Sequence, residues 1–276
     1  MLAMRYHSRV SDFVHEDRLL HLGPAATRLS AALSRPKRIA VVCVLALSGC
    51  GWLALGLVAA GPGWEALCRP ALIGGWSDAA LVPAMWVAMT LAMMLPTAGP
   101  MILTYAEIAD TAARQREAVV SPMVLTAGYV AVWLGFALVA SLLQIALARQ
   151  ALLEAGRTGA LISGAIFVVA GVYQFSALKR ACLTLCRRPF PFFFANWTTE
   201  ARGVFRLGLR QGMYCLGCCW AMMLLMFAVG AMNVVWMAAL GMAMTIEKMT
   251  TTARFTRVLG VAFTAIGLGF LISGLM

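Results

Sequence analysis

Hydrophobic residues in this chain occur in long runs, and short polar or basic segments separate one run from the next. Each run holds about 17 to 26 residues, the length that a helix needs to cross the hydrocarbon core of a bilayer. The pattern therefore predicts an all-α fold, a polytopic transmembrane helix bundle of seven spans. Their approximate ranges are 39–60, 78–95, 122–147, 159–178, 208–230, 233–249 and 257–275.

Glycine and proline mark the ends and bends of the first two spans. Gly61-Pro62-Gly63 ends the first span, and Pro96 and Pro100 bend the second. The cysteine and methionine motifs described below all follow the first span. We therefore interpret that span as an addition to a six-span core.

The composition agrees with a membrane protein and divides the chain into two parts. Of the 276 residues, 62% are hydrophobic and 12% are charged, whereas soluble domains carry about 25% charged residues. Residues 1–38 form a basic cytoplasmic leader, too long for the first part of a cleavable signal peptide, and residues 39–276 form the bundle. The leader holds His7, His15 and His21, which do not share a helical face and are interpreted as solvated.

The distribution of basic residues predicts the orientation of the bundle. With the N-terminus in the cytoplasm, only Arg69, Arg149 and Arg157 of the 22 lysines and arginines lie outside, and the other 19 lie inside. This asymmetry predicts an N-in, C-out topology. The net charge of +11 then sits at helix ends beside the lipid bilayer, so it does not indicate a nucleic-acid partner.

A group of sulfur-bearing residues lies in the fifth span, where residues 213–226 read M-Y-C-L-G-C-C-W-A-M-M-L-L-M. Cys215, Cys218 and Cys219 share one helical face, which Met222 and Met226 continue for about two turns. Thiolate and thioether ligands select soft ions, above all Cu(I). The alternative interpretation is that these residues are apolar filler in a membrane helix.

A second cysteine pair, Cys182 and Cys186, lies one turn apart on an extension of the fourth span that Pro189 ends. In the N-in topology this extension and the start of the fifth span share the cytoplasmic surface, so five thiols converge there. Because the cytoplasm keeps thiols reduced, a metal site is expected rather than disulfides. Cys215 would also lie near the start of its helix, where the helix dipole favours thiolate. The flanking cations that favour thiolate further are Lys179, Arg180, Arg187 and Arg188.

Methionines gather near these cysteines. Met85, Met89 and Met93 share one face of the second span, and most of the 18 methionines lie between residues 85 and 101 or between 213 and 249. We expect thioether ligands for Cu(I) along these helices, with zinc as the competing metal. Adaptable core packing is the alternative role of these methionines.

Charged residues are rare inside the spans, which argues against a proton-driven antiporter. Glu247 and Lys248 lie at the end of the sixth span, and we expect them to pair with water or with each other. Alternatively, Glu247 hydrogen-bonds to a ligand of the metal ion. Cys43 and Cys50 in the first span are interpreted as packing residues, and Cys68 as a free thiol in an outer loop.

Four motifs characterise the part of the chain between residues 75 and 255. They are M-W-V-A-M-T-L-A-M-M-L-P at 85–96, Y-Q-F-S-A-L-K-R-A-C-L-T-L-C-R-R-P at 173–189, Y-C-L-G-C-C-W-A-M-M at 214–223 and M-A-A-L-G-M-A-M-T-I-E-K at 237–248. Their combination resembles a bacterial family of metal-binding integral membrane proteins, domain of unknown function 2182, whose members are sometimes labelled copper chaperones. The resemblance implies a copper-linked protein of the bacterial inner membrane, with a metallochaperone or cuproenzyme as partner.

Together these patterns predict a membrane protein that binds a soft metal ion for transfer or transport and is not an enzyme. Two alternatives stay open. One is a membrane thiol–disulfide oxidoreductase, because Cys215 and Cys218 have the C-x-x-C spacing. The other is an assembly subunit of a membrane complex, without a site of its own.

The predicted topology is testable with a reporter protein. We expect a reporter fused after Pro189 to behave as cytoplasmic, because the basic residues around it stay inside. A reporter pair that is active in only one compartment measures this. Periplasmic behaviour would contradict the topology and would remove the argument that the thiols are kept reduced.

Overall fold

The computed structural model describes residues 36–60, 76–149, 156–229, 234–250 and 252–276, so nearly all of the leader 1–38 lies outside the described residues. Within these ranges the chain forms helices and no strand, as the all-α prediction requires. The helices are α3 (Pro36–Ala60), α5 (Trp76–Arg114), α6 (Pro122–Arg149), α7 (Arg157–Tyr173), α8 (Ala177–Arg187), α9 (Pro189–Ala195), α10 (Ala201–Val229), α11 (Val234–Met249) and α12 (Arg254–Leu275).

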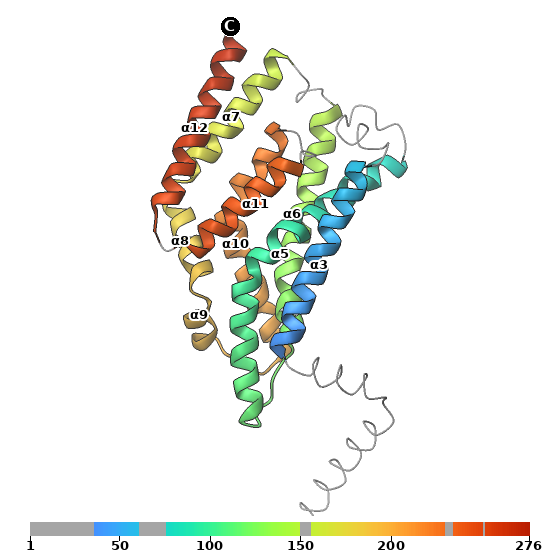
Figure 1. Cartoon of the computed structure of the whole chain (residues 1–276), viewed down its shortest axis with the longest axis vertical. Coiled ribbons are helices and arrows are strands. Elements are labelled where there is room, and N and C mark those ends of the chain that lie inside the picture. The colour runs from blue at the N-terminus through green and yellow to red at the C-terminus, as the bar shows by residue number, and fades with distance from the viewer. Residues whose placement is uncertain (1–35, 61–75, 150–155, 230–233, 251) are drawn as a thin grey trace, which may run out of the picture.

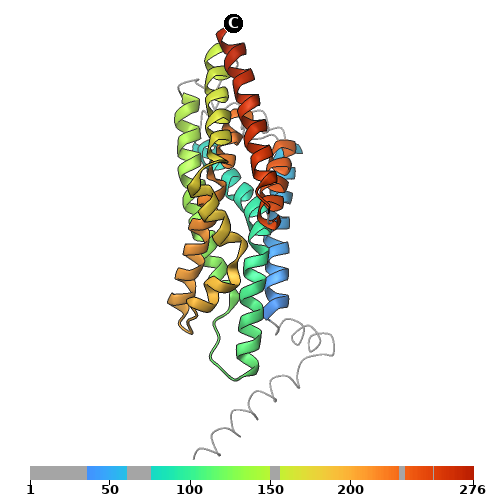
Figure 2. The same ribbon diagram turned by 90° about the vertical axis from the view of Figure 1, so that its left-hand side faces the viewer.

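The long helices form an elongated bundle around α10 (Figures 1 and 2). Helix α10 packs on α6, α7 and α8, whereas α3 packs along α5 and α12 packs along α7. Helices α8 and α9 are short and lie beside the lower half of α10 in Figure 1. Helix α10, which carries the cysteines at 215, 218 and 219, therefore contacts several other helices of the bundle.

Five of the described helices are long and apolar enough to cross a membrane: α3, α5, α6, α10 and α12. A sixth span results if α7 and α8 count as one bent span. Helix α11 has 16 residues, about 24 Å of helix, which is shorter than the ~30 Å hydrocarbon core. The structure is thus compatible with a multi-pass membrane protein, and it contains five or six candidate spans where the sequence predicts seven.

Helix α5 continues beyond the predicted end of the second span. It stays helical through Pro96 and Pro100 as far as Arg114 and changes direction along its length (Figure 1). Proline has no N–H, so Pro96 leaves the carbonyl of Ala92 without its helical donor. Two side chains of α3 fill the vacancy: the Ser48 hydroxyl and the Trp52 indole N–H donate to that carbonyl at 3.2 and 3.1 Å. The break is tolerated because its freed acceptor has partners.

The predicted extension of the fourth span is a separate helix. Helix α7 ends at Tyr173, and α8 leaves it at an angle of 63°. The Ser176 side chain caps α8 by accepting from the Lys179 backbone N–H at 3.1 Å. Helix α8 ends before Pro189, as predicted, but Pro189 then becomes the first residue of α9.

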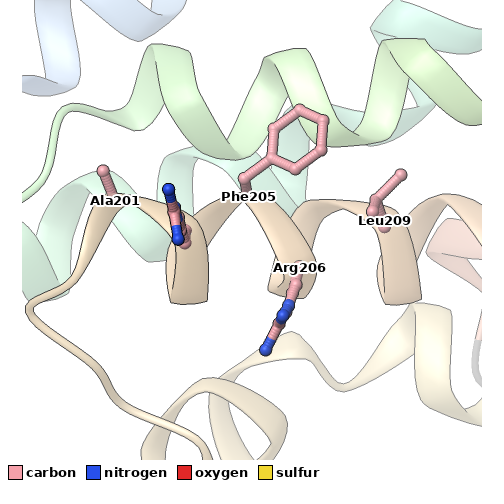
Figure 3. A pocket seen from close by; sticks show the side chains of 5 residues that line it. Ala201, Phe205, Arg206 and Leu209 are labelled. Atoms are coloured by element: carbon pink, nitrogen blue, oxygen red, sulfur yellow. The ribbon is translucent and has the colours of Figure 1, made fainter.

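Helix α10 begins at Ala201, seven residues before the predicted start of the fifth span. Its first turns are amphipathic, because exposed Arg202, Arg206 and Arg210 alternate with buried Val204 and Leu207. A hollow of about 420 Å³ lies along this face (Figure 3). Cys215 is therefore in the middle of α10, and the predicted stabilisation of its thiolate by a helix start is wrong.

Glycines allow the close approach of α7 and α12. A Cβ atom at Gly267 of α12 would lie 2.7 Å from the Val168 nitrogen and 2.8 Å from the Gly164 carbonyl oxygen. Atoms of the main chain cannot move aside as a side chain can. Small residues in membrane helices permit this kind of backbone contact.

We expect Gly267→Ala to destabilise the bundle by ~1–3 kcal/mol, because the two backbones must separate. Gly269→Ala is the matched control on the same helix, since a Cβ there meets no atom within 4 Å, and alanine favours a helix. Thermal unfolding in detergent measures the difference. Equal melting temperatures for the two variants would contradict the close packing of α7 on α12.

Candidate metal centre

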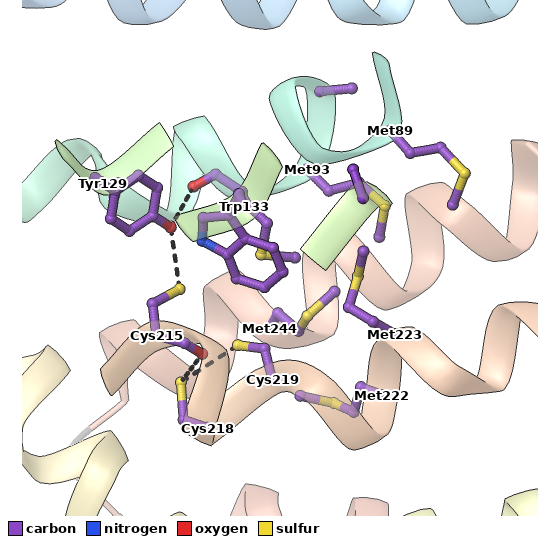
Figure 4. Close-up of a cluster of buried hydrophobic side chains, with 14 of the residues drawn as sticks. Met89, Met93, Tyr129, Trp133, Cys215, Cys218, Cys219, Met222, Met223 and Met244 are labelled. Atoms are coloured by element: carbon purple, nitrogen blue, oxygen red, sulfur yellow. Dashed lines mark hydrogen bonds between the residues drawn. The ribbon is translucent and has the colours of Figure 1, made fainter. Parts of the chain in front are cut away.

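Three thiols of α10 meet in the interior of the bundle (Figure 4). The sulfur atoms of Cys215, Cys218 and Cys219 all lie within 4.8 Å of one another, and those of Cys218 and Cys219 are 3.3 Å apart. Each residue is at most 2% exposed. The i, i+3, i+4 spacing places them on one face, so the helix itself builds the cluster.

Helix α8 adds the second cysteine pair to this cluster. The sulfur atoms of Cys186 and Cys218 are 4.0 Å apart, which agrees with the predicted convergence of the two pairs. Cys182 lies against Gly217, where an added Cβ would be 2.6 Å from the Cys182 sulfur. Both α8 cysteines are half-buried. Four thiols therefore form one group, buried on α10 and partly accessible at Cys186 on α8, and Cys182 lies beside Gly217 at its edge.

Contacts between α10 and Tyr173, the last residue of α7, hold the start of α8 in place. The Tyr173 hydroxyl, just before the bend into α8, donates to the Gly217 carbonyl. The ring of Tyr173 also packs edge-on against Trp220, with centroids 4.9 Å apart. Because residue 217 has no side chain, α8 approaches closely enough for Cys186 to reach Cys218.

Polar side chains surround the Cys215 sulfur. The Lys248 ammonium group donates to this sulfur at 3.0 Å and to the Thr97 hydroxyl at 2.7 Å. The Tyr129 hydroxyl lies 3.0 Å from the same sulfur and donates to the Met94 carbonyl at 3.1 Å. In an apolar interior a cation at this distance strongly favours the negatively charged form of its partner. Lys248 thus supplies the thiolate stabilisation that the sequence assigned to a helix start.

The expected pairing of Glu247 with Lys248 does not occur. Glu247 instead forms an ion pair with Lys179 of α8 at 2.8 Å, and both side chains are 1% exposed. Arg187 donates to the Glu247 carbonyl at 3.0 and 2.7 Å. Successive helical residues point about 100° apart, so neighbours in the sequence serve different partners. Lys179 and Arg187 join α8 to α11, next to the thiols.

Two further N–H groups near the thiols have no hydrogen-bond partner among the residues that the structure describes. They are the indole nitrogen of Trp133 and the amide nitrogen of Gln211, both in buried side chains. Gln211 lies one turn before Cys215 on the same face of α10, and Trp133 lies one turn after Tyr129 on α6, in the buried cluster that also holds the α10 thiols. Both are donors that suit a cluster of negative sulfur atoms.

The spacing of the sulfur atoms suits a shared metal ion. Metal–thiolate bonds are ~2.3 Å long, so two thiolates on one ion lie at most ~4.6 Å apart. The three α10 thiols, and Cys186 with Cys218, have separations of this size. Two or three thiolates can therefore reach one soft ion with small side-chain movements.

The predicted methionine ligands lie deeper in the same core. All five are at most 4% exposed: Met85, Met89, Met93, Met222 and Met226. They belong to one buried cluster with the α10 thiols, and their binding to metal stays a prediction. Cys43 and Cys50 lie on α3, outside this cluster, and Cys68 lies outside the described residues.

Sequence reasoning missed the polar partners of Cys215. Tyr129 lies in the third predicted span and Thr97 just after the second, and both are a long way from the cysteines along the chain. No local spacing rule connects them with a thiol. A signal did exist for Lys248, since it is a rare cation that ends a methionine-rich apolar run.

A family model described as PpoB2, copper chaperone, matches residues 83–270. The match confirms the family that the motifs resemble, and it contains all five thiols and Lys248. No curated protein and no solved structure matches the chain.

The buried ion pair beside the thiols is open to a stability test. Glu247→Gln leaves Lys179 charged and unpaired in the interior, and we expect a loss of ~3–5 kcal/mol in the free energy of unfolding. Removing both charges, with Lys179→Met and Glu247→Leu, is expected to recover part of that loss. Chemical unfolding of the three proteins measures both effects. A double variant less stable than Glu247→Gln would contradict this account of the pair.

Proposed function

The chain belongs to the PpoB2 copper-chaperone family, and from this premise we propose that it binds Cu(I) as cargo through its thiol cluster. The observation that carries the proposal is the meeting of three buried thiols within 4.8 Å, with Cys186 4.0 Å from Cys218. Cys215, Cys218, Cys219 and Cys186 are the proposed ligands, and Cys182 is an exchange ligand beside them.

Charge balance favours a monovalent ion at this site. Cu(I) needs only two or three sulfur ligands. Two thiolates, one Cu(I) ion and the Lys248 ammonium together carry no net charge. Zinc prefers four ligands in a tetrahedron, and four thiolates with Zn(II) and Lys248 would leave a buried negative charge. Uncompensated charge is costly in an apolar interior, so the cation beside Cys215 supports copper over zinc.

The exposure of the thiols suggests how the ion enters. Cys182 and Cys186 are half-buried on α8, whereas the α10 thiols are almost fully buried. A partner that donates or accepts copper, a metallochaperone or cuproenzyme, would exchange ligands with the α8 pair first. The 4.0 Å gap between Cys186 and Cys218 then allows transfer without release of the ion into water.

We place the protein in the bacterial inner membrane with the N-terminus in the cytoplasm. The uncharged part of α10 after Arg210 extends for 19 residues, 211–229, which is about 28 Å of helix. Cys215 and Cys219 lie about 7 and 14 Å beyond Arg210 along the helix. The thiols would thus lie within the membrane, close to the reducing cytoplasmic side.

The oxidoreductase alternative has less support from the geometry. Thiol–disulfide exchange requires an attacking thiolate to reach one sulfur of the pair. Cys215 and Cys218, which have the C-x-x-C spacing, are both at most 2% exposed. Small ions can reach such a site through ligand exchange, whereas a protein thiol cannot.

The metal content of the purified, reduced protein tests the proposal. We expect about one tightly held Cu(I) ion, and we expect Cys215→Ser with Cys218→Ser to remove it, because hydroxyl oxygen is a poor ligand for a soft ion. Cys43→Ser with Cys50→Ser is the matched control, since these thiols lie on α3. Elemental analysis, with zinc measured in the same samples, gives the result.

Equal copper content in the two double variants, both folded, would contradict the proposed site. Zinc in place of copper in the wild-type protein would contradict the choice of metal but not the assignment of the thiols as its ligands.

A further inference from the structure

One polar contact fixes the relative heights of three helices. The Lys248 ammonium group joins Cys215 at 3.0 Å and Thr97 at 2.7 Å, so α11, α10 and α5 meet at these residues. Helix α10 runs upward in Figure 1, whereas α5 and α11 run downward. Above this level, therefore, the residue numbers increase along α10 and decrease along α5 and α11.

Three methionines follow above this level, one on each helix. Met93 and Met244 lie four residues from Thr97 and Lys248, about 6 Å along their helix axes on the upper side, and Met223 lies eight residues from Cys215, about 12 Å along the axis of α10. Long side chains in helices lean toward the N-terminus of their own helix. Met93 and Met244 therefore lean upward and Met223 leans downward, so the three thioethers approach one height.

Contacts and burial agree with this convergence. The Met93 side chain lies 3.7 Å from the position of a Cβ atom at Gly241, and Gly241 is one turn from Met244 on α11. Figure 4 shows Met93, Met223 and Met244 extending toward one another beside Cys219. Each is at most 2% exposed. Of these three methionines, only Met93 is among the metal ligands predicted from the sequence.

We propose that Met93, Met223 and Met244 form a second site for a monovalent soft cation, Cu(I) or Ag(I), adjacent to the thiol site. The proposal rests on the proposed function only because Cu(I) would reach this site through Cys219. Three neutral thioethers bind a soft ion, whereas they contribute little to the binding of zinc. The second site is weaker than the thiolate site, so it fills last and empties first.

The charges of the neighbouring groups can accommodate a second ion. Three thiolates balance one ammonium group and two monovalent cations. The thiolates lie one to two turns from the thioethers, close enough to lower the cost of a cation in an apolar interior. A monovalent ion in each site thus leaves no net charge in this part of the bundle.

Aromatic side chains pack beyond the three methionines, on the side away from the thiols. Phe227 lies one turn above Met223 on α10, and its ring packs on Trp86 of α5 with centroids 5.2 Å apart. Trp86 is held by a 2.6 Å hydrogen bond from its indole nitrogen to Gln144. Buried aromatic side chains therefore pack beyond the thioethers, and the second site is a reserve position rather than part of an open channel.

The number of bound ions tests this proposal. The reduced full-length chain in detergent is loaded with Cu(I) without oxygen and treated with rising amounts of a Cu(I)-selective chelator. We expect two ions per chain, one of which the chelator removes first. Replacing Met93, Met223 and Met244 by Leu keeps the volume nearly constant and should abolish only the weakly held ion. The single variant Met244→Leu is a milder change and should lower the affinity for that ion at least tenfold.

The matched control replaces three other methionines by Leu. Met101 is buried on α5, and Met242 and Met249 are exposed on α11, so this variant should keep both ions. Replacing Cys215 and Cys218 by Ser should remove the tightly held ion, and Cys219 and the thioether site should still take up Ag(I).

The outcomes separate this proposal from the proposed function. One ion in the wild-type protein, or two in the folded Met93, Met223 and Met244 variant, would overturn the second site and leave the thiol site intact. Loss of both ions in that variant would also overturn it, because the sulfur atoms would then form one composite site. No Cu(I) in the wild-type protein would refute the proposed function itself.

Discussion

A positive charge inside an apolar bundle has to be balanced, and the contacts of Lys248 meet this constraint. Its ammonium group joins the Cys215 sulfur and the Thr97 hydroxyl, and so connects α11, α10 and α5. The same contact sets the heights at which the sulfur atoms of these helices face one another. An electrostatic requirement of the interior thus determines where soft ligands meet.

The position of α8 depends on a second buried charge pair. Lys179 and Glu247 hold α8 against α11, while the absence of a side chain at Gly217 lets α8 approach α10. Both features are needed for Cys186 to lie near Cys218. The thiols of α10 would remain clustered without them, because helix geometry alone brings residues at i, i+3 and i+4 together. The accessible part of the site is therefore a product of tertiary packing.

Features that depend on helix geometry alone could be predicted from the sequence, whereas features that depend on tertiary packing could not. Apolar periodicity located α3, α6 and α12 to within a few residues, and helical spacing identified the thiols. The start of α10 was missed because its first turns are amphipathic, with Arg202, Arg206 and Arg210 on the exposed face. The partners of Glu247 and Lys248 were also missed. Adjacent residues point in different directions, and their partners lie on helices that only the folded chain brings near.

The carbonyl of Ala92 has a consequence for the modular organisation of the chain. The family match begins at residue 83, and α3 lies wholly before it. Yet Ser48 and Trp52 of α3 satisfy the acceptor that Pro96 leaves free. A chain that began at the start of α5 would carry an unsatisfied carbonyl in an apolar environment, at a cost of several kcal/mol. The smallest autonomous folding unit is therefore larger than the segment by which the family is recognised.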